Sequence, residues 1–108
     1  MIAIIFEVTP KASGKQAYMD IAAELKIHLA SMPGFISIER FQSLNDPEKI
    51  LSLSFWEDET AVARWRKDMH HQNAQHQGRH HLFADYRLRV ASILRDYGMN
   101  NRQQAPQE

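Results

Sequence analysis

The sequence predicts an α+β fold with the element order strand, helix, strand, strand, helix, strand. Three observations point to this class. Four short segments alternate between apolar and polar residues, two longer segments repeat apolar residues at steps of three and four, and turn-forming residues separate the segments. A chain with this order forms the split βαβ, or ferredoxin-like, arrangement, in which two helices cover one face of a four-stranded antiparallel sheet.

The first part of the chain is predicted to form a strand and a helix. Residues 2–9 carry apolar side chains on both faces, as a central strand does. Pro10 and Ser13-Gly14 end that pattern, and a helix is expected from about residue 13 to residue 32, where Pro33-Gly34 stops it. The single apolar stripe of this helix consists of Tyr18, Ile21, Ala22, Leu25, Leu29 and Met32.

A hairpin follows. Two strands are predicted at residues 35–44 and 50–56, with a turn at 45–47, where the sequence is Asn-Asp-Pro. Alternation along the first of these strands places Phe35 and Phe41 on one face of the sheet and the isoleucines at 36 and 38 on the other.

The second half of the chain is predicted to contain one more helix and one more strand. The helix runs from Asp58 to roughly Gly78, because three acidic residues at 57–59 suit a helix N-terminus. Residues 86–96 alternate with a period of two and are expected to form the last strand, with residues 80–85 as a short helical turn or linker. The domain then spans residues 1–98. Since residues 100–108 contain no large apolar side chain, we expect a disordered tail over 99–108.

Composition excludes several classes of function. Thirteen basic and thirteen acidic residues are interspersed, so the chain lacks the positive field that nucleic-acid binding normally uses. The absence of cysteine excludes disulfides, a thiolate nucleophile and zinc sites built on sulfur. The N-terminal apolar run is too short for a membrane span and has no basic flank, so it is expected to be a strand. These features predict a soluble, cytoplasmic protein.

The face of the sheet that carries no helix is predicted to be apolar as well. A monomer would expose that patch, and we expect a homodimer that packs sheet on sheet to cover it. Glu7 interrupts the apolar first strand, and its carboxylate is expected to form an ion pair with Arg40, Arg87 or Arg89 on a neighbouring strand.

The chemistry-bearing part of the chain is the stretch from Leu51 to Gly78. Here an alternating strand leads directly into an amphipathic helix that carries Trp65 and three histidines, at 70, 71 and 76. Trp56, at the exit of the strand, is expected to be structural.

Several motifs in this stretch and around it resemble those of a known protein family. The chain resembles the antibiotic biosynthesis monooxygenase family, small dimeric α+β barrel proteins, over most of its length. The matching motifs are Pro33-Gly34-Phe35, SLSFWEDETAVARW at 52–65, His71, Ala74, Gly78-Arg79, Phe83 and VASILRDYG at 90–98.

The resemblance implies oxygen chemistry without a metal, a flavin or any other cofactor. A small phenol or hydroquinone is deprotonated and passes an electron to O₂, and the resulting pair recombines to a peroxide that collapses to a quinone. The protein supplies a dry apolar cavity, a base and a group that favours anions.

The resemblance also suggests which residues take these roles. The predicted catalytic residues are Trp65 as a wall of the cavity, His71 as the base and Arg79 as the group that stabilises an anion. The predicted substrate-binding residues are Phe6, His76, Phe83 and Tyr86; His76 is the second candidate for the base, and the hydroxyls of Tyr86 and Tyr97 either reach a ligand or lie at a dimer contact.

Each candidate also has a plain structural interpretation. Trp65 has the spacing of a core aromatic residue, and Arg79 that of a solvated residue at a helix end. His28 lies beside the apolar stripe of the first helix and is expected at the surface or in packing. His76 and His80 have metal-ligand spacing, but Gly78 weakens the helix between them and no carboxylate accompanies them, so no metal site is predicted.

Two rival functions remain open. Haem-degrading monooxygenases belong to the same superfamily, and likeness to them would require a histidine about ten residues after the helix tryptophan and an asparagine on the first strand. Gln75 holds the first position, with His76 one place later, and the first strand has Phe6 and Glu7 without an asparagine. The other alternative is a dimer without enzymatic activity that binds a small aromatic molecule, because this fold serves many unrelated roles.

Overall fold

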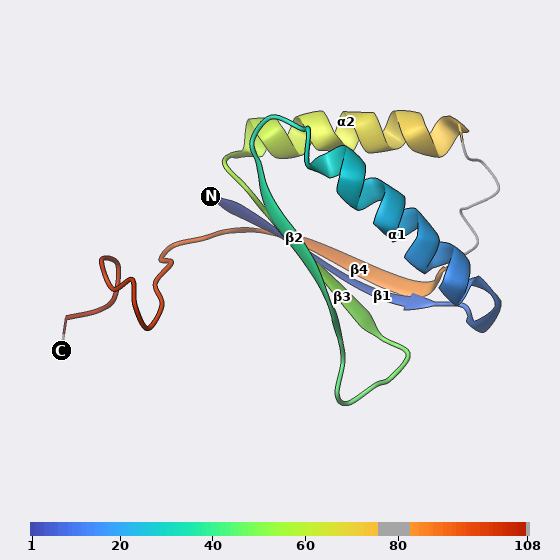
Figure 1. Cartoon of the computed structure of the whole chain (residues 1–108), viewed down its shortest axis with the longest axis horizontal. Helices are drawn as coiled ribbons and strands as arrows, with labels where there is room; N and C mark the ends of the chain where they lie inside the picture. Colours follow the sequence, from blue (N-terminus) through green and yellow to red (C-terminus); the bar gives the residue numbers. More distant parts are fainter. Residues whose placement is uncertain (76–82, 108) are drawn as a thin grey trace.

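The computed structural model describes the backbone of residues 1–75 and 83–107, and the side chains of 1–68 and 83–107. Its elements in chain order are β1 (Ile2–Pro10), η1 (Ala12–Gly14), α1 (Lys15–Leu29), β2 (Phe35–Gln42), β3 (Ile50–Trp56), α2 (Glu59–Gln75) and β4 (Phe83–Ser92). The four strands form an antiparallel sheet in the order β2-β3-β1-β4, and both helices lie on one face of it (Figure 1). The predicted element order and the ferredoxin-like class are confirmed, with β1 at a central position.

The first helix is shorter than the predicted range of 13–32, and the predicted end of the second helix near residue 78 lies outside the described residues. α1 is preceded by the single turn η1 and gives way after Leu29 to a turn in which the Met32 backbone N–H donates to the Leu29 carbonyl at 3.0 Å. The Asp58 side chain begins α2, since its Oδ1 accepts a hydrogen bond from the Ala61 backbone N–H at 2.8 Å. A side-chain cap of this kind contributes about 1 kcal/mol to helix stability.

The predicted bounds of the last strand are wrong at both ends. Residues 83–85 were expected in a helical turn or linker, but they continue β4 because Asp85 pairs with Thr9 and Phe83 pairs with Pro10 of β1. The strand stops at Ser92 rather than at residue 96, since Ser92 pairs with Ile2, the first residue of β1. Residues 80–82 of the predicted turn lie outside the described residues.

The face predicted for Phe35 is also wrong. A β-bulge shifts the register of β2 against β3 between Phe35 and Ser37. The extra residue turns Phe35 toward the helices, where its ring meets Trp56 at a centroid distance of 5.3 Å, while Phe41 points to the opposite face. Phe35 and Phe41 therefore do not share a face.

Two apolar clusters fill the space between the sheet and the helices. The first core cluster consists of Ile2, Ile4, Leu29, Trp56, Ala61 and Val62, and the second core cluster consists of Val8, Tyr18 and Ile50 with Phe6 and Phe83 packed against them. Each cluster joins at least one helix to the helix-facing side of β1 and β3, so the two clusters together hold the layers in place.

Gly34 fixes the distance between the β2 entry and the start of α2. Its φ of 83° lies in the left-handed region, and a Cβ added there would come within 2.5 Å of the Ala61 Cβ. The Gly34 carbonyl accepts a hydrogen bond from the Glu57 backbone N–H at 2.8 Å. Pro33-Gly34-Phe35 thus forms a close contact between two elements, and this contact helps to position α2 and the tryptophan that α2 carries.

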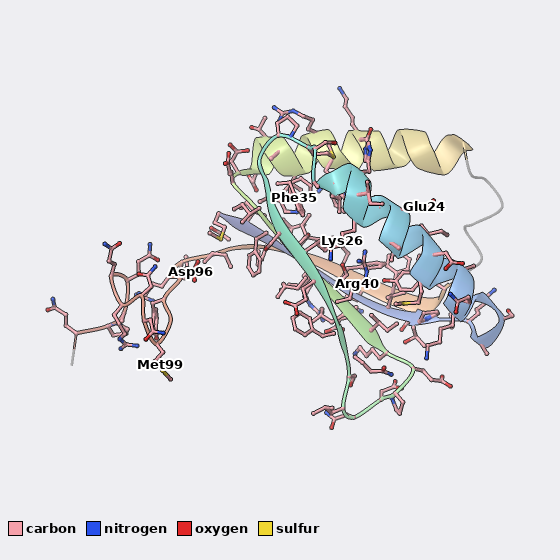
Figure 2. All side chains as sticks on the ribbon, viewed as in Figure 1. Glu24, Lys26, Phe35, Arg40, Asp96 and Met99 are labelled. Atoms are coloured by element: carbon pink, nitrogen blue, oxygen red, sulfur yellow. The ribbon has the colours of Figure 1, made fainter. Side chains whose placement is uncertain are left out.

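The chain leaves the sheet after Ser92. Asp96 and Met99 lie in a tail that extends away from the sheet and the helices (Figures 1 and 2). Within the tail, the Asp96 backbone N–H donates to Gln104 Oε1 at 2.7 Å, and Arg102 lies over the Tyr97 ring at 5.4 Å. None of the helices in the described residues is both long and apolar enough to cross a membrane.

Candidate functional site

The helix-facing side of β4 is apolar and uncovered. Tyr86, Leu88 and Val90 point to this side because they pair with Val8, Phe6 and Ile4 of β1, all of which face the helices. Their exposed fractions are nevertheless 61%, 44% and 42%. We call these three residues the β4 strip. An apolar surface on the inner side of a layered domain that the helices leave open is a place where an apolar ligand can bind.

Three further aromatic rings, those of Phe6, Phe83 and Tyr18, adjoin the β4 strip at Tyr86. The Phe6 ring lies 5.9 Å from that of Phe83 and 5.7 Å from that of Tyr86, and the Phe83 ring also meets Tyr18 of α1 at 5.6 Å. Three of the four predicted substrate-binding residues, Phe6, Phe83 and Tyr86, therefore lie together. We call Phe6, Tyr18, Phe83 and Tyr86 the aromatic cluster; its edge-to-face and tilted contacts form a wall against which a planar ring can pack.

The structure places Trp65 in the other cluster. Its ring lies 5.5 Å from that of Trp56, and it packs partly buried against the first core cluster. Trp56 is fully buried, and its indole N–H donates to Ser54 Oγ at 3.0 Å, which agrees with the structural role expected for it. The indole N–H of Trp65 is also buried but has no acceptor within the described part of the chain.

The Nε–H of Arg40 is a second buried donor that has no acceptor among the described residues. Arg40 lies on β2 (Figure 2), and its pairing with Ser52 turns it toward the helices. A buried donor without a partner costs about 1–3 kcal/mol, so both nitrogens are suited to an oxygen atom supplied from outside the chain.

A contact between the helices was not predicted. His28 Nε2 lies 2.5 Å from Asp68 Oδ2, which joins α1 to α2 one turn after Trp65. The sequence analysis assigned His28 to the surface or to packing, and no local pattern pairs two residues that are 40 positions apart. The contact holds the segment of α2 that carries Trp65 against α1.

Three predicted site residues cannot be located. The backbone of His71 belongs to α2, but its side chain lies outside the described residues, as do His76 and Arg79 entirely. Their roles as base and anion-stabilising group stay predictions. Among the predicted residues that are described, the structure brings together Phe6, Phe83 and Tyr86, and it places Trp65 beside Trp56.

Other binding sites find little support in the described residues. Within them, no group of three histidine, cysteine, aspartate or glutamate side chains could hold a metal ion. A hollow of about 280 Å³ lies where the tail leaves the sheet. It is lined by Met1, Ile93, Leu94, Asp96, Asn101, Gln103 and Gln104, and it contains none of the predicted site residues.

The sequence model of a known family, antibiotic biosynthesis monooxygenase, matches residues 1–77, from β1 through the end of α2. The chain belongs to the antibiotic biosynthesis monooxygenase family. Membership confirms the resemblance that the motifs predict, and it supports monooxygenase chemistry.

Similar proteins differ in what their names state. A curated relative from Pyricularia oryzae, named jasmonate monooxygenase ABM, is 45% identical over 93 residues, which are 86% of this chain and 43% of that protein. The chain thus spans less than half the length of this relative. Among solved structures, SnoaB, a cofactor-independent oxygenase from Streptomyces nogalater, superposes with a TM-score of 0.73 at 12% identity, covering 88% of this chain and 94% of the other.

A heme-degrader of the same fold is also similar. MhuD from Mycobacterium tuberculosis, solved with two hemes in its active site, superposes with a TM-score of 0.72 at 16% identity, covering 91% of this chain and all of the other. At such low identities the two solved structures establish only the shared fold. The chemistry of this chain must therefore be inferred from its own β4 strip and buried donors.

Proposed function

We propose that this chain is a monooxygenase that oxidises a small hydroxylated aromatic or quinol substrate with O₂ and needs neither a metal nor a flavin. The observation that carries the proposal is the open β4 strip beside the aromatic cluster. It offers an apolar, ring-lined surface on the inner side of the domain, which suits a planar substrate. The family match and the likeness of the fold to SnoaB, a cofactor-independent oxygenase, support the same chemistry.

The reaction in this proposal uses the substrate as its own electron donor. A histidine at position 71 or 76 takes the proton of the substrate hydroxyl, and the phenolate gives one electron to O₂. The phenoxyl radical and superoxide recombine into a carbon-bound peroxide, and the peroxide collapses to the quinone as its outer oxygen leaves in water. Arg79 and the indole N–H of Trp65 supply positive charge and a hydrogen bond to the oxygen atoms that become negative on this path.

The test measures oxygen consumption by the purified chain with a panel of hydroquinones. Metal and flavin are left out, a chelator is present, and uptake is corrected for autoxidation of each substrate. Jasmonate is not a hydroquinone and is tested separately, because of the name of the relative from Pyricularia oryzae. We expect accelerated uptake with at least one hydroquinone and formation of one quinone for each O₂ consumed. No acceleration with any compound would favour the alternative of a binding module without enzymatic activity.

Haem degradation is the second candidate, and the likeness to MhuD is what favours it. Against it, β1 contains no asparagine, and Glu7 turns its carboxylate to the face without helices, so Phe6 is the side chain that β1 offers to the site at this point. Titration with hemin separates the two candidates. A sharp Soret band that saturates stoichiometrically, and that is lost in His76→Ala, would favour haem chemistry over quinol oxidation.

A further inference from the structure

One row of side chains crosses the helix-facing side of the sheet between the two core clusters. Taken in the strand order β2, β3, β1, β4, the row consists of Arg40, Ser52, Phe6 and Leu88. On β1, the first core cluster lies on one side of this row, at Ile2 and Ile4, and the second lies on the other side, at Val8. We call these four residues the Arg40 row.

The two halves of the Arg40 row differ in polarity. The half toward β4 is apolar, because Phe6 belongs to the aromatic cluster and Leu88 to the β4 strip. The half toward β2 carries the guanidinium of Arg40 and the hydroxyl of Ser52, a residue that is only 8% exposed. Since neighbouring strands lie about 5 Å apart, the Cα atoms of Phe6 and Arg40 are separated by about 10 Å. A ligand whose ring packs on Phe6 therefore has a cation within reach of its side chain.

Arg40 is a cation on the inner side of the domain that the described part of the chain does not neutralise. Its Nε–H is buried and has no acceptor there, and the ion pairs that the described residues form with one another do not include Arg40. Desolvating a charge is costly, and arginine is rarely buried without a partner. The residue as a whole is nevertheless partly exposed, so a ligand can reach the guanidinium.

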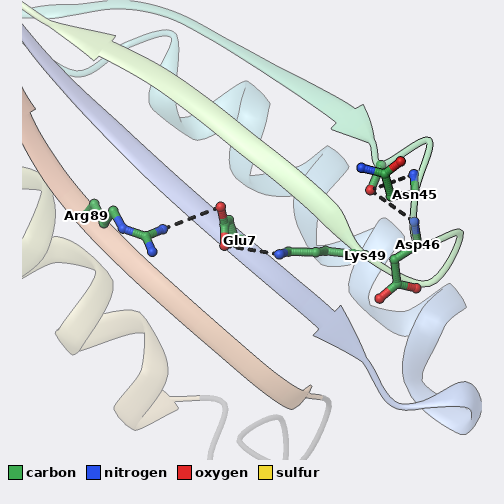
Figure 3. A network of polar contacts seen from close by, with 6 residues as sticks. Glu7, Asn45, Asp46, Lys49 and Arg89 are labelled. Carbon is green, nitrogen blue, oxygen red and sulfur yellow. Dashed lines mark hydrogen bonds and ion pairs between the residues drawn. The ribbon is translucent and has the colours of Figure 1, made fainter.

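Glu7, the residue after Phe6 on β1, shows the contrast. Its carboxylate lies 3.3 Å from Lys49 Nζ and 3.4 Å from Arg89 Nη1, on the face of the sheet without helices (Figure 3). The sheet thus supplies two cations to this acid, and Glu7 is excluded as a partner of Arg40 because it lies on the opposite face. Arg40 is left for a negative charge that comes from outside the chain.

We propose that Arg40 binds a carboxylate of the substrate, with a hydrogen bond from the Ser52 hydroxyl, while the ring of the substrate packs on Phe6 and Leu88. The substrate is then a hydroxylated aromatic carboxylic acid. This inference rests on the proposed function, because it names the chemical class of the same substrate. Holding the acid at one end of the Arg40 row also fixes the orientation of the ring at the other end.

The donors of this half of the row match a carboxylate. A guanidinium presents its N–H groups in a planar fork that fits the two oxygens of a carboxylate, and the buried Nε–H of Arg40 is one of these donors. A phosphate monoester would bring nearly two negative charges to a row that contains one cation, and part of its charge would stay unbalanced.

Binding of acids that cannot be oxidised at a hydroxyl tests the proposal without turnover. Phenylpropionate and phenylbutyrate are compared by calorimetry at neutral pH with their primary amides, which keep the ring and the chain length but carry no charge. We expect at least one acid to bind about 10- to 150-fold more tightly than its amide, the range of a hydrogen bond to a charged group. Arg40→Met should abolish this preference and leave the affinity for the amide within about threefold. Arg66→Met removes an exposed arginine of α2 and should behave like the wild type.

Thermal unfolding separates binding from a structural role of Arg40. Because its Nε–H is buried without an acceptor in the described residues, Arg40→Met should not lower the Tm of the free chain. The acid should raise the Tm of the wild type and not that of Arg40→Met. Arg40→Lys keeps the charge but loses the planar fork, so we expect its affinity for the acid to lie between those of the wild type and Arg40→Met.

Three results would overturn the proposal. They are acids that bind no more tightly than their amides, a preference for the acid that survives in Arg40→Met, and a Tm of Arg40→Met far below the wild type that Arg40→Lys restores. Oxygen uptake tells this failure from that of the proposed function. Uptake with neutral hydroquinones but no preference for acids would refute the carboxylate site alone. A preference that depends on Arg40, without uptake for any hydroquinone or hydroxylated aromatic acid, would support the site and refute the reaction.

Discussion

Replacing Trp65 with phenylalanine separates a packing role from a hydrogen-bonding role, because it keeps an aromatic ring and removes the indole N–H. That N–H is buried without an acceptor in the described part of the chain, at a cost of about 1–3 kcal/mol to the folded state. The smaller ring loses packing against Trp56, which costs a similar amount. Since the two effects offset each other, we expect the free energy of unfolding to change by no more than about 1 kcal/mol. For a domain of this size, that is a Tm shift of about 4–8 °C.

The expected effect of Trp65→Phe on turnover is larger. A hydrogen bond to an oxygen atom that becomes negative in the transition state contributes about 1.5–3 kcal/mol, so its loss should lower kcat/KM by about 10- to 150-fold. Oxygen uptake at low substrate concentration gives kcat/KM, and thermal unfolding gives the stability. Trp56→Phe is the matched control. It leaves Ser54 without its donor in a fully buried site and should destabilise the chain by about 2–3 kcal/mol.

The comparison between the two tryptophans can refute this reasoning. If Trp65→Phe unfolds as readily as Trp56→Phe, then Trp65 is a core residue and its N–H is not reserved for a ligand. If the variant keeps full kcat/KM with a substrate that the wild type oxidises, the N–H takes no part in the reaction, whatever its stability.

Three further predictions concern the fold. Gly34→Ala should cost about 2–4 kcal/mol in chemical denaturation, because it combines a left-handed φ with a contact of 2.5 Å to Ala61, and adding Ala61→Gly should recover part of that loss. The hydrogen bond from Lys49, followed by the charges of Lys49 and Arg89, holds the pKa of Glu7 below its ordinary value of 4.5. Its contribution to stability is thus present above that value and is lost as pH falls through the lowered pKa. Glu7→Gln should lower Tm at neutral pH and leave it unchanged in stronger acid. Truncation after Gly98 should change Tm by no more than a few degrees if the tail is disordered, as predicted; a large loss would show that the tail packs on the domain.

Strand ends that are marked by neighbouring residues in the sequence were predicted correctly, and strand ends that are set by pairing with distant residues were not. The bounds of β3 were predicted to the residue, because a turn precedes it and acidic helix-starting residues follow it in the sequence. The start of β4 was missed because nothing local distinguishes residues 83–85 from a linker. Those residues are extended only because the end of β1 pairs with them. The bulge that turns Phe35 toward the helices was likewise hidden, since it depends on the register between two strands.

The predicted ion pair of Glu7 shows the same limit. An ion pair across the sheet was expected and is present, and Arg89 was among the three expected partners. Lys49 was not anticipated, and Arg40 is excluded because the register turns it toward the helices. Which residues share a face can be predicted within one strand from its alternation, but which residues meet across strands requires the register. The sequence therefore offered Phe6, Phe83 and Tyr86 as separate candidates, and only the register between the strands shows that they lie together.

Adjacent residues of β1 serve the two faces of the sheet, so the candidate site depends on the register of this strand. Phe6 joins the aromatic cluster on the helix-facing side, while Glu7 joins Lys49 and Arg89 on the other. A slip of one residue in β1 would exchange these faces, so pairing with both β3 and β4 fixes which side chains of β1 reach the candidate site.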